Sequence, residues 1–239
     1  MLLQLTDLKK RIEYSLCQHF ATTEDVKTFC ERAKVAEVGV ACLNPVHVAL
    51  AAELLAGTKI ELSGNVGFPF GSHPTMAKVV ETEHVVRDGA TQIDMVINVG
   101  ALKSRQDSMV MDDIKAVVDA AEGRPVKTII ETWVLSREEK TRACRLAEEA
   151  GAYMIKTSTG VRTQYLDLVN QQPRGALPED IVLIRQTLKK ATKIKASGGI
   201  YTLEDVIALL KAGADQLGVS KGEELIRKFA VEYPHGLEI

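Results

Sequence analysis

The chain has 239 residues, 46% of them hydrophobic, and its 30 basic and 32 acidic side chains leave a formal net charge of −2. This length is close to the ~250 residues typical of one (β/α)8 barrel, so we expect a single domain over residues 1–239. Charges are spread without blocks, which argues against nucleic acid as a partner. Neither a secretory signal nor a run of ~20 apolar residues is present, so a cytoplasmic protein without a membrane partner is expected.

The cysteines and histidines show no metal-ligand spacing. The four cysteines (Cys17, Cys30, Cys42 and Cys144) contain no CxxC motif, and we expect free thiols that serve as small hydrophobic residues. The five histidines form neither an HxH nor an HExxH pattern, although a catalytic metal would need several converging ligands. The sequence therefore predicts no metal site.

Strand-like runs alternate with amphipathic helical runs along the whole chain. Eight strands are predicted, at residues 11–16, 37–43, 59–66, 92–98, 126–131, 152–157, 193–198 and 214–219. Helical runs between them include residues 45–57, 75–89, 107–123, 136–151, 178–191 and 202–213. Several of these runs close on a glycine suited to a helix C-cap, namely Gly57, Gly89, Gly123, Gly151 and Gly213. Ser136 with Glu139 and Thr202 with Asp205 predict capping boxes at two helix starts.

This alternation requires a mainly parallel sheet, either open and doubly wound or closed into a barrel. The count of eight strands favours closure, and the predicted fold class is therefore α/β, a TIM (β/α)8 barrel. A Rossmann-type sheet would need GxGxxG after its first strand. The stretch "GNVGFPFG" has only a loose glycine pattern, with no helix beginning inside it.

Polar residues at the carboxyl-terminal ends of the predicted strands are the candidates for chemistry, because TIM barrels carry their active sites there. They are Asn65, Asp94, Asn98, Glu131, Lys156, Lys195 and Ser220. Lys156 and Lys195 occupy similar places in adjacent strands, and a glycine-containing loop follows each. One such lysine could extend its ammonium group to water, but the pair favours a function.

The two lysines suggest amine chemistry. Ammonium groups ~6 Å apart at an effective dielectric of ~20 repel by roughly 3 kcal/mol, or about two pKa units, and desolvation acts in the same direction. A neutral amine attacks a carbonyl to form a Schiff base. We therefore expect one lysine to be the nucleophile and the other to lower its pKa, although the charges do not say which is which. Asp94, in an apolar strand, is either a structural ion-pair partner or a carboxylate that moves protons.

Glycine-containing loops follow the last three predicted strands, as "TSTGV", "ASGGI" and "LGVSKGEEL". They would bring backbone N–H groups together at the side of the barrel mouth where many TIM barrels bind phosphate. Ser220 with Glu223 could alternatively be a simple capping box.

Taken together, these stretches resemble the deoxyribose-phosphate aldolase family, class I aldolases with the TIM-barrel fold, over nearly the whole chain. The motifs that carry the resemblance are "VGVACLNP", "GFPFG", "DGATQIDMVINVGALKS", "VKTIIET", "EAGAYMIKTSTG" and "IKASGGIYTLEDVIALLKAGADQLGVS". The resemblance implies that Lys156 is the Schiff-base lysine, Lys195 the second lysine that perturbs it, and Asp94 the proton-relay carboxylate. It also implies phosphate contacts at Gly160, Gly198, Gly199, Gly218 and Ser220.

The activity implied by the resemblance is reversible cleavage of 2-deoxyribose 5-phosphate into acetaldehyde and glyceraldehyde 3-phosphate, without a cofactor. Relatives of this kind are often dimers, so a homodimer is a candidate assembly. Three alternatives are a Schiff-base aldolase for another sugar phosphate or aldehyde, a phosphosugar isomerase or epimerase with a carboxylate base, and a non-catalytic sugar-phosphate-binding barrel. The intact lysine pair argues against the last two.

The chain departs from the family pattern around the expected substrate position. Departing residues are Glu13, Tyr14 and Ser15 in the first strand, Gln18 and His19 after it, Trp133, Lys221, and a longer polar loop after Gly160 that contains Arg162 and Arg174. Trp133 could pack against a helix and Lys221 could be solvated. Alternatively, the added basic residues enlarge the anionic pocket for a different sugar phosphate.

Overall fold

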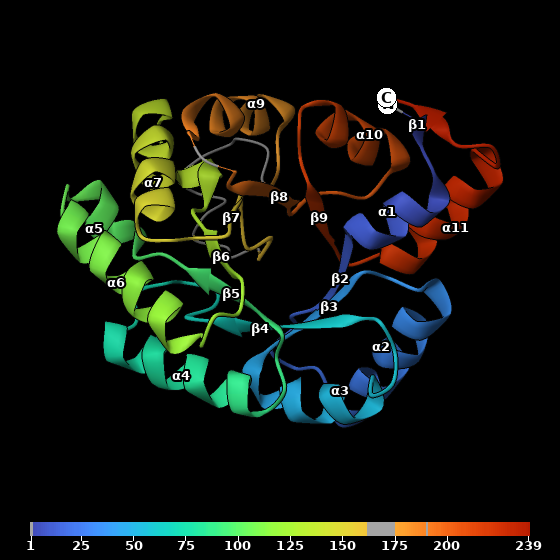
Figure 1. The fold of residues 1–239 in the computed structure, drawn as a ribbon, viewed down its shortest axis with the longest axis horizontal. Helices are drawn as coiled ribbons and strands as arrows, with labels where there is room; N and C mark the ends of the chain where they lie inside the picture. Colours follow the sequence, from blue (N-terminus) through green and yellow to red (C-terminus); the bar gives the residue numbers. More distant parts are fainter. Residues whose placement is uncertain (1, 162–174, 190) are drawn as a thin grey trace.

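The computed structural model describes residues 2–161, 175–189 and 191–239. Within these ranges, eight parallel strands close into a barrel in chain order, as Figure 1 shows. The strands are β2 (Ile12–Leu16), β3 (Val40–Leu43), β4 (Glu61–Val66), β5 (Gln92–Val96), β6 (Val126–Ile129), β7 (Met154–Lys156), β8 (Lys193–Ser197) and β9 (Gln216–Val219). The predicted TIM barrel is confirmed.

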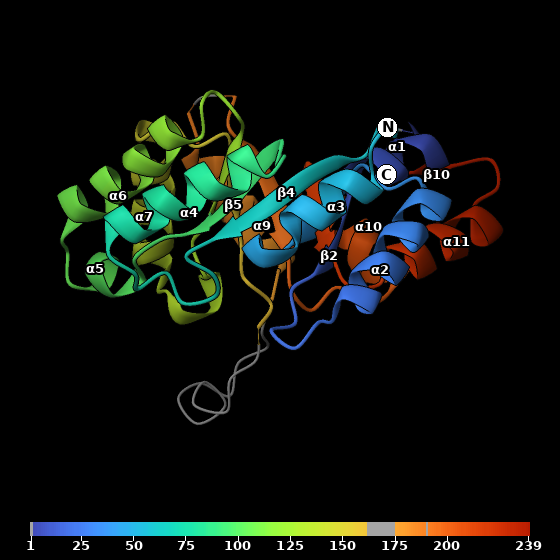
Figure 2. The same ribbon diagram turned by 90° about the horizontal axis from the view of Figure 1, so that it is seen from below.

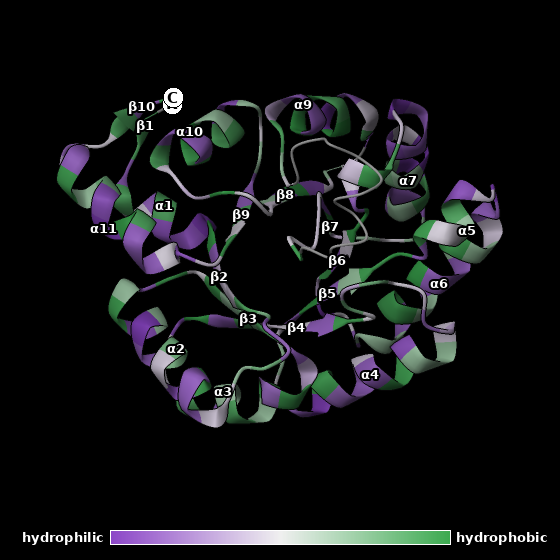
Figure 3. Ribbon diagram, turned by 180° about the vertical axis from the view of Figure 1, so that it is seen from behind, coloured by the Kyte–Doolittle hydropathy of each residue, from purple (hydrophilic) through white to green (hydrophobic). Residues whose placement is uncertain are grey.

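Helices surround the barrel and cover the outer face of the sheet (Figure 1). They are α1 (Leu5–Arg11), α2 (Thr23–Ala36), α3 (Val48–Leu54), α4 (Thr75–Arg87), α5 (Val99–Lys103), α6 (Asp107–Ala120), α7 (Arg137–Glu149), α9 (Pro178–Thr187), α10 (Leu203–Lys211) and α11 (Gly222–Glu232), with short 3-10 turns η1 (Pro45–His47) and η2 (Thr132–Val134). Hydrophilic and hydrophobic residues intermingle along them, as expected of helices with one face on the barrel (Figure 3). Each helix in the described ranges is too short or too polar to span a lipid bilayer.

A two-stranded antiparallel sheet ties the ends of the chain together. It pairs β1 (Leu2–Leu3) with β10 (Leu237–Glu238), and Figure 2 shows the two termini side by side. This sheet lies outside the barrel, so it contributes no side chain to the interior described below.

Local signals in the sequence explain where most helices begin and end. Ser136 accepts a hydrogen bond from the backbone N–H of Glu139, and Thr202 accepts one from Asp205, which confirms both predicted capping boxes. The five predicted C-cap glycines all have positive φ values, from 77° at Gly57 to 107° at Gly213.

Several predicted bounds and one predicted cap differ from the structure, and two of these differences have a local cause. A capping box of Ser220 with Glu223 is absent, because Lys221 is the N-cap of α11 and makes no side-chain cap. The strand predicted from residue 37 begins at Val40. Glu37 is left-handed and caps α2, and Val38 and Gly39 donate backbone hydrogen bonds to Ala33 and Lys9, so these residues turn the chain before the ladder starts.

The strand pleat explains why charged residues stand in otherwise apolar strands. Successive side chains of a strand point to opposite faces of the sheet. In β5, Ile93 and Met95 belong to the apolar core, whereas Asp94 between them contacts lysines of three other strands across the barrel. The barrel interior at this level is therefore ionic, while the outer face of the strands packs beneath the helices.

Candidate active site

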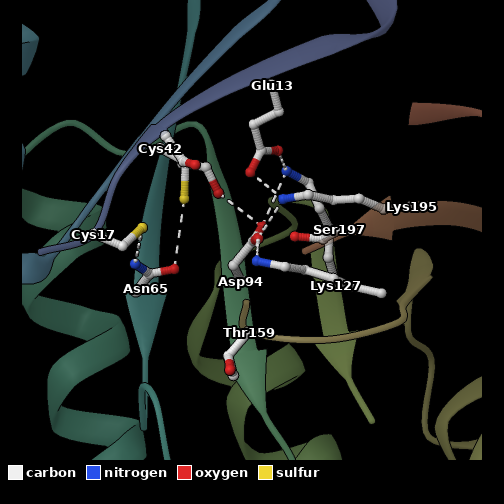
Figure 4. Close-up of polar contacts among 12 residues, drawn as sticks. Glu13, Cys17, Cys42, Asn65, Asp94, Lys127, Thr159, Lys195 and Ser197 are labelled. Atoms are coloured by element: carbon white, nitrogen blue, oxygen red, sulfur yellow. Dashed lines mark hydrogen bonds and ion pairs between the residues drawn. The ribbon is translucent and has the colours of Figure 1, made fainter. Parts of the chain in front are cut away.

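Five charged side chains meet inside the barrel, drawn in part in Figure 4. They are Glu13 of β2, Asp94 of β5, Lys127 of β6, Lys156 of β7 and Lys195 of β8, and we call them the ionic cluster. None is more than 4% exposed. Asp94 Oδ2 accepts hydrogen bonds from Lys156 Nζ at 2.7 Å and from Lys195 Nζ at 2.5 Å. Asp94 Oδ1 lies 3.1 Å from Lys127 Nζ.

Glu13 holds the other side of the ionic cluster. Its two carboxylate oxygens accept hydrogen bonds from Lys127 and Lys195, one each. Lys195 is thus held between both carboxylates, whereas the carboxylate partner of Lys156 within the ionic cluster is Asp94. The structure therefore brings together the three residues expected from the sequence and adds Glu13 and Lys127.

Both carboxylates of the ionic cluster are held in the ionised form. Burial by itself acts to raise their pKa values, but the neighbouring ammonium groups outweigh it. As a result, the pKa of Asp94 lies well below its usual range and that of Glu13 is also lowered. Three lysines facing two ionised carboxylates leave an excess of one positive charge when every group is ionised. One lysine of the three is therefore poised to lose a proton.

The pKa shifts of the two lysines differ from the expectation that Lys195 lowers the pKa of Lys156. The pKa of Lys156 is raised, because the attraction of Asp94 outweighs the burial that acts to lower it. The pKa of Lys195 is lowered, chiefly by burial, and the neighbouring ammonium groups of Lys127 and Lys156 add to the effect. The repulsion argument considered the lysine pair without its carboxylates, and in the resting site those carboxylates reverse the outcome for Lys156.

Lys127 and Glu13 were missed as site residues. Lys127 is the second residue of the predicted strand "VKTIIE" and was not singled out, and Glu13 appeared only as a departure from the family pattern. One signal could have found Lys127. A lysine within an apolar strand needs a partner inside the barrel, and the ladder pairs Lys127 directly with Asp94.

A cavity of about 360 Å³ opens above the ionic cluster at the barrel mouth. Lys156 and Lys195 line it, and so do all five residues predicted to contact phosphate: Gly160, Gly198, Gly199, Gly218 and Ser220. Its wall also includes Ser15, Gln18, His19 and Phe20, which follow one another closely at the end of β2 and in the loop beyond it. The predicted residues thus share one cavity, whereas Asp94 lies behind the lysines.

The glycines of this cavity have local structural reasons. Gly160, Gly198 and Gly199 adopt positive φ values of 72°, 88° and 70°. A Cβ atom at Gly218 would lie 2.7 Å from Ser197 Oγ and 3.0 Å from Lys195 Cε. Glycine at this position therefore leaves room for Lys195 to cross the barrel.

Glu131 and Trp133 form a second polar group at the mouth. Trp133 Nε1 donates a hydrogen bond to Glu131 Oε1 at 2.7 Å, and Thr159 Oγ1 donates to Glu131 Oε2 at 2.7 Å. Burial raises the pKa of Glu131. Trp133 therefore helps to tie the end of β6 to the loop after β7, a more specific contact than the helix packing considered from the sequence.

Other singled-out residues lie away from the ionic cluster. Asn98 caps α5, accepting a hydrogen bond from the backbone of Ala101. Tyr14 stacks on Phe29 with ring centroids 4.5 Å apart, on the helix side of β2. Lys221 is half exposed and lies 3.8 Å from Glu224. Arg162 and Arg174 lie outside the described residues.

One group of described residues has the spacing of metal ligands. The ligand atoms of Glu13, Cys42 and Asp94 all lie within 4.8 Å of one another. However, lysine ammonium groups contact both carboxylates, so a divalent cation would have to displace them against an existing positive charge. The chemistry of these donors fits ammonium groups better than a metal ion.

The fold and this arrangement define the class, a TIM-barrel protein with a lysine-centred cavity at the barrel mouth. A family model described as DeoC/LacD family aldolase matches residues 2–226. The chain belongs to the DeoC/LacD family of aldolases.

Similar proteins support this assignment. A deoxyribose-phosphate aldolase from Clostridium botulinum is 44% identical over 220 residues, covering 92% of this chain and 99% of the relative. One from Alkaliphilus oremlandii is 43% identical over 221 residues, covering 92% and 95%. Among solved structures, the aldolase QR15 superposes with a TM-score of 0.87 at 33% identity, covering 95% of this chain and 98% of QR15. A tetrameric deoxyribose-phosphate aldolase from Aeropyrum pernix superposes with a TM-score of 0.82 at 28% sequence identity, covering 95% of this chain and 92% of that structure.

Proposed function

We propose that this protein reversibly cleaves 2-deoxy-D-ribose 5-phosphate into acetaldehyde and D-glyceraldehyde 3-phosphate through a Schiff base on Lys156. The substrate is taken from the curated relatives, which are described as deoxyribose-phosphate aldolases. The mechanism is supported chiefly by one contact: Asp94 Oδ2 lies within hydrogen-bond distance of both Lys156 Nζ and Lys195 Nζ. One oxygen shared by two amines offers a proton a short path between them.

The first step is the release of a proton from Lys156, whose pKa is raised in the resting site. The lowered pKa of Lys195 makes it the lysine of the ionic cluster that is most readily neutral, and a neutral Lys195 can take up that proton through Asp94. The neutral Lys156 amine then attacks carbon 1 of the open-chain sugar and forms a carbinolamine. Proton return along the same path lets the hydroxyl leave as water, which gives the iminium ion.

Carbon–carbon cleavage uses the iminium ion as an electron sink. The bond between carbons 2 and 3 breaks, its electron pair forms the enamine double bond, and the hydroxyl proton of carbon 3 passes to a water molecule or to the neutral amine of Lys195, which lines the cavity. Glyceraldehyde 3-phosphate is released. Protonation of the enamine and hydrolysis of the resulting iminium ion free acetaldehyde and restore Lys156, so no cofactor takes part.

The phosphate end of the substrate is assigned to the glycine loops. Lys156 lines one cavity with all five residues assigned to the phosphate: Gly160, Gly198, Gly199, Gly218 and Ser220. Backbone N–H groups in such loops suit an anion because their dipoles point outward. A phosphorylated sugar held at that end would present its carbonyl carbon to Lys156.

Borohydride reduction in the presence of acetaldehyde tests this mechanism. An ethyl group on Lys156, located by peptide mass spectrometry, is the expected result, together with acetaldehyde release from 2-deoxyribose 5-phosphate. Lys156→Leu should lose both signals, whereas Lys193→Met, at an exposed lysine hydrogen-bonded to Tyr153 just before the neighbouring strand β7, should keep both. An ethyl group on another lysine, or none on a folded protein, would contradict the proposal.

A second candidate substrate is a different phosphorylated aldehyde acceptor. Gln18 and His19 line the cavity at positions where the family pattern has other residues, which favours an altered acceptor contact. A comparison of kcat/KM for deoxyribose 5-phosphate synthesis with that for other phosphorylated and unphosphorylated aldehydes separates the two.

The homodimer and the cytoplasmic location stay predictions from the sequence.

A further inference from the structure

Two cysteines lie side by side at the edge of the candidate active site. Cys42 is on β3 and is 1% exposed, and Cys17 follows the end of the neighbouring strand β2. The ladder pairs Ser15, two residues before Cys17, with Cys42, so Cys17 follows the strand that neighbours the strand of Cys42. Cys17 lines the 360 Å³ cavity together with Lys156.

Asn65 of β4 contacts both sulfur atoms, as Figure 4 shows. Its Nδ2 donates a hydrogen bond to Cys17 Sγ at 3.3 Å, and Cys42 Sγ donates one to its Oδ1 at 3.5 Å. One amide therefore holds both sulfurs in place, with Cys17 on the cavity side.

Charge divides the roles of the two thiols. Contact with Cys42 lowers the pKa of Cys17, and the Asn65 amide and the ammonium groups of Lys156 and Lys195 act in the same direction. The pKa of Cys42 is raised well above its usual value by Cys17, by burial and by the nearby carboxylates of Glu13 and Asp94. Cys17 is thus the thiol that ionises more readily to the reactive thiolate, and Cys42 is the one that ionises less readily.

We propose that Cys17 and Cys42 form an oxidation site, at which hydrogen peroxide or an organic hydroperoxide reversibly joins them as a disulfide and shuts the active site. The Cys17 thiolate attacks the peroxide, the O–O bond breaks, and sulfenic acid forms on Cys17 with release of water or alcohol. The Cys42 sulfur then attacks the sulfenic sulfur, the S–O bond breaks, and a second water leaves. Two thiols are oxidised by two electrons and one peroxide is reduced, so the step balances.

Closure requires the sulfur atoms to approach to about 2.05 Å. The strand β2 ends at Leu16, so Cys17 lies beyond the hydrogen-bonded ladder, and the proposal requires the chain at Cys17 to shift toward Cys42.

The disulfide would also disturb the ionic cluster. Cys42 Sγ lies within 4.8 Å of ligand oxygens of Glu13 and Asp94, and the ladder pairs Asn65 with Asp94. Disulfide formation removes both sulfur contacts of Asn65 and draws the wall at Cys17 across the cavity. We expect aldolase activity to fall at least tenfold on oxidation and to return with dithiothreitol.

Peroxide treatment of the intact protein tests this inference. The wild type should lose two hydrogen atoms per chain and yield a peptide that links Cys17 to Cys42. Activity of each variant is read relative to its own reduced form. Cys17→Ser and Cys42→Ser should each form no such link and keep their activity ratio. Cys144→Ala is the matched control, because burial raises the pKa of that thiol to about 12, and this variant should respond to peroxide as the wild type does.

Several results would overturn the inference. They are a cross-link between other cysteines, oxidation of Cys17 to sulfinic acid without a link, or a Cys17–Cys42 link that leaves activity unchanged. The activity readout rests on the proposed aldolase function, but the link is measured by mass alone. A reduced wild type that neither releases acetaldehyde nor forms a borohydride adduct would refute the proposed function, and peptide mapping would still decide whether the thiol pair reacts.

Discussion

Replacement of Lys127 by methionine should raise the pH at which the enzyme becomes active. Lys127 is fully buried and contacts Glu13, whose other oxygen contacts Lys195. Ammonium groups on the two oxygens of one carboxylate lie ~5 Å apart and repel by about 3 kcal/mol at an effective dielectric of ~20. Removal of that repulsion raises the pKa of Lys195 by roughly two units. Without Lys127, the Glu13 carboxylate is paired with Lys195, and its attraction raises the pKa of Lys195 further.

The sign of the effect follows from the proposed proton path. Lys195 must be neutral to accept the proton of Lys156, so a higher pKa of Lys195 moves the acidic limb of the pH profile to higher pH. The kcat/KM for cleavage of 2-deoxyribose 5-phosphate should fall by up to about 100-fold near neutral pH and recover at high pH.

The assay is acetaldehyde release measured from about pH 6 to about pH 10. Lys193→Met is the control, because it removes an exposed lysine from the same strand as Lys195. Unfolding by urea is measured in parallel to verify that the variants are folded. An acidic limb that stays in place, or that moves to lower pH, would refute the assignment of Lys195 as the proton acceptor.

Further predictions concern the carboxylates and the glycine behind Lys195. Asp94→Asn should lower kcat by about 10²- to 10⁴-fold and slow formation of the borohydride adduct. If single-turnover kinetics show adduct formation at the wild-type rate, the proposed proton transfer between Lys156 and Lys195 through Asp94 is contradicted. Gly218→Ala should lower kcat by about tenfold, because the new Cβ would meet Ser197 and Lys195, and an unchanged kcat would show that the barrel absorbs the added carbon. The folded-state pKa values of Asp94 and Glu13 lie below their ordinary values of 3.8 and 4.5. Their contribution to stability is therefore present above about pH 4.5 and lost as the pH falls, so urea unfolding should show a declining free energy below about pH 4.

Much of the candidate site was accessible from the sequence because its residues follow local rules. Lys156 and Lys195 end adjacent apolar strands, and parallel strands place such residues at one mouth of the barrel. The glycine loops after those strands line the same cavity for the same reason. The catalytic and phosphate-binding roles given to these residues stay proposals, and the borohydride and kinetic experiments test them.

The sequence failed where a role depends on partners far along the chain. Lys127 and Glu13 are 114 residues apart and meet only because the barrel closes. Cys17 and Cys42 were interpreted as small hydrophobic residues, since nothing in their local pattern indicates that Asn65 contacts both sulfurs. The pattern of residues along a strand predicts which face of the sheet a side chain occupies. It does not predict which side chains from other strands contact it there.

The sequence by itself determined the order of strands and helices, the helix caps and the barrel fold, because these follow from hydrophobic period, capping residues and glycines within short stretches of chain. Only the tertiary structure decided the protonation of the site. Lys156 keeps its proton and Lys195 is the lysine poised to lose one. That difference arises from distances to Asp94, Glu13 and Lys127 across the barrel, and electrostatic energies at such short range in a buried site depend on those distances rather than on residue type.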